Sequence, residues 1–421
     1  MVSKHRKLFI RGISLCDQVF FSGANFLFTI ILAKFFSEIE LAAYGIALSI
    51  AMTLQGVQRT SYVVQNSLLP QPVLRRRARK LLGQQLVAWA VLFGLGGVGI
   101  VVTSFIWGDS HFYWAIVFSS VVLTLIYIQL DFDRILMIKY ERFVDPLVTS
   151  AGYLVMMGIM FFVIPKYHIG FDAFMVLIGI FTLAKSSWLL TIIGKPDLFW
   201  GWRLMKRDTR RYLGASLLGV AGYAGYTNFP IFILGAVAAP IQSAAYAGMR
   251  SLMQPLLVIV KSLDIIDKNF FPNHSKKHDD LRGPFFRLFA LYGGGALLMT
   301  IGMALFGEQI VRLVYGEKYA AYSHLLVGWG LIFMMLSITS PIETVIVKLG
   351  KINQYNLQRI PAGIIGVILS YLLCADMGAW GAIIACLAGW VISVGLALWL
   401  MRGVIFPRLF AVPLLPNSTP Q

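Results

Sequence analysis

Residues 12–66 read GISLCDQVFFSGANFLFTIILAKFFSEIELAAYGIALSIAMTLQGVQRTSYVVQN, and residues 214–262 read GASLLGVAGYAGYTNFPIFILGAVAAPIQSAAYAGMRSLMQPLLVIVKS. Each stretch is an apolar span, a short break and a second apolar span, and each lies near the start of half the chain. With one residue of slippage, the segments that match are 22–26 (SGANF) with 225–229 (GYTNF) and 43–45 (AYG) with 245–247 (AYA). A half-length repeat in an apolar chain predicts a transporter built from two lobes.

The composition indicates a membrane protein. Hydrophobic residues make up 58% of the chain, charged residues only 13%, and the mean hydropathy is +0.75. A soluble domain carries about 25% charged residues, so this chain cannot cover itself with a water-facing surface. Cys16, Cys374 and Cys386 lie in or beside apolar runs, without the spacing of a disulfide framework or a metal site. We interpret them as small buried hydrophobic residues.

The apolar runs predict about twelve transmembrane helices, because each is long enough to cross a bilayer. The predicted spans are 13–36, 41–66, 84–107, 112–138, 146–164, 173–193, 212–236, 241–266, 285–306, 324–347, 360–375 and 378–401. The expected fold is therefore an all-α polytopic membrane protein with two six-helix lobes. We place the lobes at residues 1–207 and 208–421.

The distribution of basic residues tests this count. Alternate loops, together with both termini, contain 27 of the 36 lysines and arginines. The opposite loops contain only Lys166, Arg312 and Lys318, with Lys34 at a helix end. Positive loops stay in the cytoplasm, so both termini are predicted to be cytoplasmic. The net charge of +17 then reflects membrane topology, and we expect no nucleic-acid partner.

Three connecting segments have a distinct composition. The aromatic and basic loop 194–211 is the expected linker between lobes, lying along anionic lipid headgroups. Residues 307–323 suit an interfacial helix or a lid. The proline-rich tail 407–421 is predicted to be disordered.

Three cations inside predicted spans have no opposite charge at helical spacing: Arg59, Lys185 and Arg250. A charge at the centre of a membrane helix costs roughly 2.5–3.5 kcal/mol on insertion scales, so each needs a partner or a hydrated cavity. Gln55 shares a helix face with Arg59. We expect these four side chains to bind an anionic substrate, and a pyrophosphate suits arginine because guanidinium binds phosphate oxygens bidentately. The alternative is a salt bridge across helices to Asp17, Asp131 or Glu343.

Asp17 and Glu343 are acids within spans that lack a partner on their own helix. Either can take up a proton or bind sodium during a transport cycle, because burial raises carboxylate pKa values. The residues favour neither ion. The chain has no P-loop motif and no catalytic constellation, so we expect no enzyme activity, no metal site and no cofactor beyond a proton or sodium gradient.

Two segments resemble a known family. Residues 17–58 (DQVFFSGANFLFTIILAKFFSEIELAAYGIALSIAMTLQGVQ) resemble the first two helices of polysaccharide flippases of the Wzx type, which belong to the multidrug/oligosaccharidyl-lipid/polysaccharide (MOP) exporter superfamily. Residues 313–359 (LVYGEKYAAYSHLLVGWGLIFMMLSITSPIETVIVKLGKINQYNLQR) look like that family's ninth-to-tenth loop, tenth helix and basic turn. The acids of the drug-exporting branch have no counterpart here, which leaves the coupling ion open.

The resemblance implies a V-shaped pair of six-helix bundles around a central cavity. It also implies that an undecaprenyl-pyrophosphate-linked oligosaccharide, a surface polysaccharide precursor, crosses a bacterial inner membrane by alternating access. Expected partners are membrane lipids, a polysaccharide polymerase and glycosyltransferases. Two other hypotheses remain open: a drug exporter of the same superfamily, and a non-transporting membrane subunit that docks polysaccharide synthases through its basic loops.

Overall fold

The chain is described by a computed structural model that covers residues 4–63, 71–107, 111–142, 144–256, 260, 282–348 and 352–410. Helices account for most of these residues, and none of them lies in a strand. The first half contains α1 (Lys4–Phe35), α2 (Glu38–Gln58), the π-helical turn η1 (Arg59–Val63), α4 (Gln71–Trp107), α5 (His111–Lys139), α6 (Val144–Tyr167) and α7 (Phe171–Ile193). The second half contains α8 (Leu198–Thr227), α9 (Phe229–Val237), α10 (Pro240–Leu252), α12 (Arg282–Tyr315), α13 (Glu317–Ala320), α14 (Leu325–Lys348), α15 (Ile352–Met377) and α16 (Ala379–Phe410).

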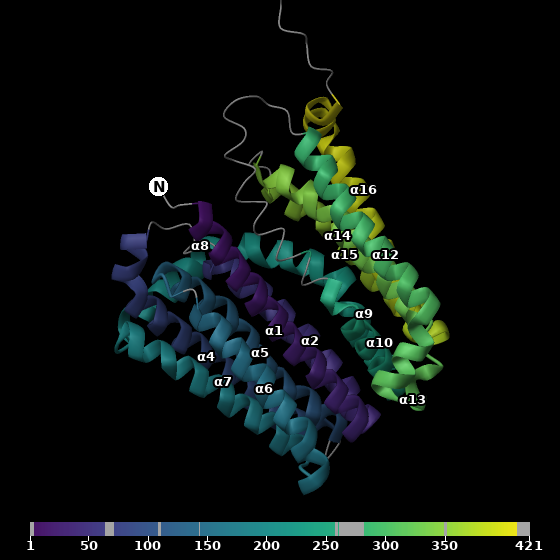
Figure 1. The fold of residues 1–421 in the computed structure, drawn as a ribbon, viewed down its shortest axis with the longest axis horizontal. Coiled ribbons are helices and arrows are strands. Elements are labelled where there is room, and N and C mark those ends of the chain that lie inside the picture. The colour runs from purple at the N-terminus through teal and green to yellow at the C-terminus, as the bar shows by residue number, and fades with distance from the viewer. Residues whose placement is uncertain are drawn as a thin grey trace, which may run out of the picture.

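The helices form two lobes (Figure 1). In the first lobe α1 packs on α6, and α5 contacts α2, α4 and α7. In the second lobe α15 packs on α8 and α16, while α14 contacts α12 and α16. The lobes meet where α2 packs against α9 and α10.

The described helices account for the predicted spans. Ten of them are long and apolar enough to cross a membrane, and the count rises to eleven if α8 and α9, bent by 49° at Asn228, are taken together as one span. The one remaining predicted span, 241–266, begins as α10 and extends into residues outside the described part of the chain. The prediction of an all-α polytopic membrane protein with about twelve helices in two lobes is confirmed.

Large apolar side chains cover the outside of the bundle. Phe105 is 92% exposed, Leu313 79% and Phe162 73%. An exposed apolar surface of this extent marks contact with lipid. The buried face of each helix therefore packs on protein, while the exposed face contacts acyl chains.

Residues that the sequence repeat aligns with each other are also in contact at the junction between the lobes. Gly45 on α2 lies against Ala247 on α10, so that a Cβ built on Gly45 would be 2.4 Å from the Ala247 Cβ. These are the residues that the repeat aligns. Their neighbours Tyr44 and Tyr246 are both almost fully buried. Equivalent residues meet across an axis that relates two similar bodies, which fits a pseudo-two-fold between the lobes.

Helix α8 differs from the prediction for loop 194–211, because this segment is helical from Leu198 onward. Its first half crosses α4 at Gly201 and Gly83, where a Cβ on Gly201 would lie 2.3 Å from the Gly83 carbonyl carbon. Its second half packs on α15 through Gly222 and Gly363. The predicted lobe boundary at 207/208 falls inside this one helix, and it stays a prediction.

Two other segments also differ from expectation. In residues 307–323, α12 continues to Tyr315 and α13 follows directly. Tyr315 Oη donates a 3.0 Å hydrogen bond to the Gly248 carbonyl, so the segment is tied to α10. In the tail, residues 407–410 belong to α16, and residues 411–421 lie outside the described part of the chain.

We predict that Gly222→Ala destabilises the protein by about 1–3 kcal/mol, because overpacking a tight contact costs this much. A Cβ at this position would lie 2.8 Å from the Arg359 carbonyl carbon. Gly214→Ala on the same helix is the matched control, since nothing lies within 4 Å of its Cβ position. Thermal unfolding in detergent measures both variants, and equal midpoints for the two would contradict the tight α8–α15 contact.

Candidate functional site

Arg250 reaches from one lobe to the other. It lies in the last turn of α10 and points Nη1 at Ser49 Oγ (3.5 Å) and Nη2 at Met52 Sδ (3.3 Å), both on α2. Its guanidinium carbon lies 5.5 Å from the centre of the Trp329 ring. These contacts are long, and no carboxylate oxygen among the described residues lies within ion-pair distance of it. A guanidinium so placed retains most of its capacity to bind an anion.

Neutral polar groups surround Arg250 at the lobe junction. Asn228, at the bend between α8 and α9, donates to Thr53 Oγ1 at 2.9 Å. Ser251 donates to Thr29 Oγ1, also at 2.9 Å. Each bond joins the two lobes. The junction is thus partly polar, although buried apolar side chains of both lobes also pack together there.

Arg59 and Gln55 lie further along α2. Arg59 opens the π-helical turn η1, and its side chain is exposed. It is seven residues beyond Met52, or about 10 Å along the helix axis. Gln55 Nε2 donates to the Tyr127 carbonyl on α5 at 3.2 Å, so this side chain is turned into its own lobe. The structure therefore brings Arg250 to the junction and places Arg59 near the predicted cytoplasmic end, without joining them in one cluster.

Asp17 is buried in the first lobe and lies against Arg134. The Asp17 Oδ2 to Arg134 Nε distance is 2.7 Å, and Ser150 donates to Asp17 Oδ1 at 2.5 Å. Arg134 also lies 5.4 Å from the Phe21 ring centre. The two charges are close but poorly aligned, because Nε and Nη2 of Arg134 have no hydrogen-bond acceptor of suitable geometry among the described residues. This ion pair joins α1 to α5 inside the membrane.

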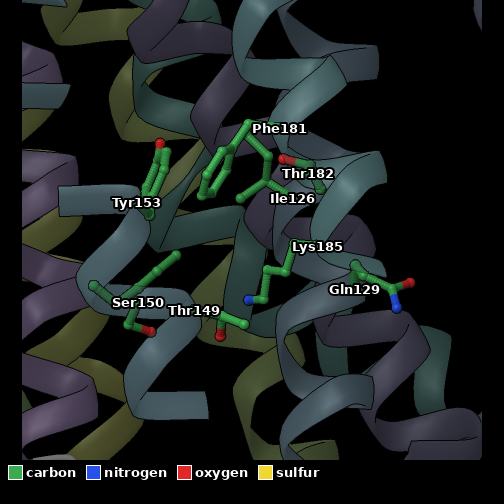
Figure 2. Close-up of a pocket in the computed structure, with 9 residues that line it drawn as sticks. Ile126, Gln129, Thr149, Ser150, Tyr153, Phe181, Thr182 and Lys185 are labelled. Atoms are coloured by element: carbon green, nitrogen blue, oxygen red, sulfur yellow. The ribbon is translucent and has the colours of Figure 1, made fainter. Parts of the chain in front are cut away.

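Lys185 lines a small pocket in the same lobe (Figure 2). Its side chain extends toward Thr149, with Gln129 on the opposite side. The centre of a water molecule can occupy a volume of about 20 Å³ in this pocket. A pocket of this size can hold water but is too small for a sugar. Asp133, Asp17 and Arg134 all act on Lys185 electrostatically. The charges that act on Lys185 all belong to its own lobe, and the residues that line the pocket belong to that lobe as well.

A chain of glutamines runs from this pocket to the end of α2. Gln58 donates to Gln85 at 3.0 Å, Gln85 to Gln129 at 3.2 Å, and Gln129 to Asp133. All four side chains are buried. Sequence reasoning missed this chain, although Gln85 within an apolar run and Gln129 four residues before Asp133 were visible signals. The chain connects the pocket to the residue that precedes Arg59.

Glu343 on α14 has Arg359 as a neighbour, with Oε2 3.7 Å from Nη2. Sequence reasoning counted Arg359 among the loop cations, because the predicted span began at residue 360. Helix α15 instead begins at Ile352, which places Arg359 two turns inside it. Both acids predicted to bind the coupling ion thus lie beside an arginine, and their role in coupling stays a prediction.

The sequence matches no protein-family model and no curated protein. Solved structures do match. A lipid II flippase, MurJ, in an inward closed conformation has a TM-score of 0.68 at 15% identity, covering 91% of this chain and 86% of that one. A multidrug resistance MATE family transporter of the MOP superfamily, in an inward-facing conformation, has a TM-score of 0.54 at 13% identity, covering 93% and 94%.

A third match is a MOP superfamily transporter from Pyrococcus furiosus, with a TM-score of 0.50 at 12% identity and 94% coverage of both chains. Its reported binding pocket has reversed polarity. At these identities the likeness establishes the fold, which is the two-lobe fold of MOP superfamily transporters and flippases.

We predict that Asp17→Asn destabilises the protein by about 3–5 kcal/mol, because it leaves the Arg134 charge buried and unpaired. Replacing both residues, as in Asp17→Asn with Arg134→Met, is expected to cost less than Asp17→Asn alone. A double-mutant cycle of thermal unfolding in detergent measures this coupling. Additive effects of the two changes would show that the pair contributes nothing.

Proposed function

We propose that this protein is a flippase for an undecaprenyl-pyrophosphate-linked oligosaccharide in a bacterial inner membrane. Three observations support the proposal: the two-lobe fold, the structural likeness to a lipid II flippase, and the chemistry of the lobe junction. The single observation that carries it is Arg250, a guanidinium at the junction with no acid partner among the described residues.

The electrostatics favour an anionic substrate. A cation within the membrane is costly, and a phosphate that enters the junction offsets this cost by supplying the missing charge. Guanidinium forms paired hydrogen bonds with phosphate oxygens, which fixes the headgroup as well as attracting it. Arg59, about 10 Å further along α2, extends the positive potential toward the predicted cytoplasmic entrance. Arg250 and Arg59 are thus the proposed headgroup contacts. Gln55 and Lys185 are turned into the first lobe and are not among the proposed headgroup contacts.

Alternating access requires the lobe contacts to break and form again. At the predicted external end, α2 and α10 pack through Gly45 and Ala247, and Lys318 forms an ion pair with Glu38. These contacts close that end in the present state. Opening it requires the lobes to rock apart around the bound headgroup.

Asp17 and Glu343 provide the proposed link to an ion gradient. Each carboxylate compensates an arginine, Arg134 and Arg359 respectively. Uptake of a proton, or of sodium, removes that compensation and releases the arginine. Both ions satisfy this scheme.

A second candidate function is drug export, favoured by the likeness to a multidrug resistance MATE family transporter. Deleting the gene distinguishes the two, because a drug exporter leaves surface polysaccharide intact and a flippase does not. A non-transporting subunit that holds a polymerase and glycosyltransferases is excluded if the purified protein alone moves lipid-linked sugar in liposomes.

We predict that Arg250→Ala lowers polymer export at least tenfold while the protein remains in the membrane, because an ion-assisted contact contributes about 1.5–3 kcal/mol. Polymer export with Arg250→Lys is expected to lie between the wild-type level and that of Arg250→Ala, since lysine keeps the charge and loses the paired hydrogen bonds. The measurement is complementation of a deletion strain, with membrane protein level followed by immunoblot.

The matched control is Arg402→Ala, an arginine that is exposed and packs on Trp399 at the far end of α16. Wild-type export in Arg250→Ala, with Arg402→Ala also unchanged, would rule out the proposed headgroup contact.

A further inference from the structure

Arg359 lies close to two tyrosine rings. Its guanidinium carbon lies 4.2 Å from the centre of the Tyr355 ring and 5.2 Å from that of Tyr223. Nη2 also donates to Tyr355 Oη at 2.9 Å. The rings attract the cation, and the hydrogen bond to Tyr355 holds Nη2 in place, so the guanidinium is positioned before any ligand arrives.

The carboxylate beside Arg359 is not tightly bound to it. The 3.7 Å separation from Glu343 exceeds the 2.7–2.9 Å of a charge-assisted hydrogen bond. The Asp17–Arg134 pair, at 2.7 Å, is 1 Å closer. In addition, the buried Nε of Arg359 has no hydrogen-bond acceptor among the described residues. Arg359 therefore keeps a donor that a better-placed anion can satisfy.

Arg359 borders the junction between the lobes. Arg359 lies close to Tyr223 on α8, and both Arg359 and Arg250 act on this tyrosine electrostatically. One turn earlier on α8, Val220 contacts α2, where a Cβ on Gly56 would lie 3.4 Å from Val220 Cγ1. At the end of α8, five residues after Tyr223, Asn228 contacts Thr53. Arg359 thus lies in the second lobe at a level between Arg250 and Arg59.

We propose that Arg359 is a further anion-binding position of this junction and that Glu343 is its resident counter-ion, displaced when a phosphate oxygen binds. The inference rests on the proposed function and adds to it the regulation of the site. In the empty state Glu343 compensates the charge of Arg359. A prenyl pyrophosphate replaces the loose ion pair with aligned hydrogen bonds and satisfies Nε. The released carboxylate is then open to a proton or a cation.

The test is equilibrium binding of farnesyl pyrophosphate to the full-length protein in detergent, followed by tryptophan fluorescence, with farnesol as the uncharged control. Glu343→Gln is expected to tighten binding about three- to tenfold, because the competing charge is gone. Arg359→Ala is expected to weaken binding about tenfold. In the Arg359→Ala background, Glu343→Gln is expected to have no effect, since the two residues act as a unit. Arg359→Lys tests the requirement for the planar group where the alanine variant does not fold.

Unchanged or weaker binding in Glu343→Gln would overturn this assignment, as would an equal effect of Glu343→Gln in both backgrounds. Binding that requires Arg250 but ignores Arg359 would overturn it and leave the proposed function standing. No binding of farnesyl pyrophosphate to the wild-type protein would overturn both. Arg402→Ala controls for general loss of positive charge.

Discussion

A guanidinium in an apolar interior needs a counter-charge, hydrogen-bond acceptors or water, and this constraint organises the charged residues of the chain. Arg134 meets it with Asp17, a close pair within one lobe. Arg359 meets it loosely, with Glu343 and two tyrosine rings. Among the described residues, Arg250 meets it only with a hydroxyl and a thioether of α2 across the lobe junction and with the indole ring of Trp329 in its own lobe. The three differ in how completely the protein compensates them, and the least compensated one lies where the lobes meet.

Much of the fold follows from patterns that the bilayer imposes. Apolar length and the alternation of basic loops predict the spans, because both are set by the membrane rather than by tertiary contacts. The repeat predicts two lobes, and Gly45 against Ala247 shows that aligned residues also meet in space. The helix from Leu198 onward in segment 194–211 was not predicted, because its glycine crossing with α4 is visible only in three dimensions.

The site was less predictable than the fold. Arg250 was identified because it lacks a partner at helical spacing, which a sequence does reveal. The pairs Asp17–Arg134 and Glu343–Arg359 join helices far apart in the chain, and no periodicity encodes them. Arg359 was assigned to a loop because a span is predicted to begin where the apolar residues begin, here at residue 360. Helix α15 instead begins two turns earlier, at Ile352. The buried glutamine chain likewise depends on three helices meeting.

Helix α8 has a consequence for how the two halves are joined. Its first part belongs by contact to α4 and its second part to α15, with Gly214 in open space between them. If one lobe rotates relative to the other, α8 must therefore bend, because no loop separates its contacts with α4 from its contacts with α15. The halves are consequently not independent modules, because both pack on one continuous helix that crosses the predicted boundary between them.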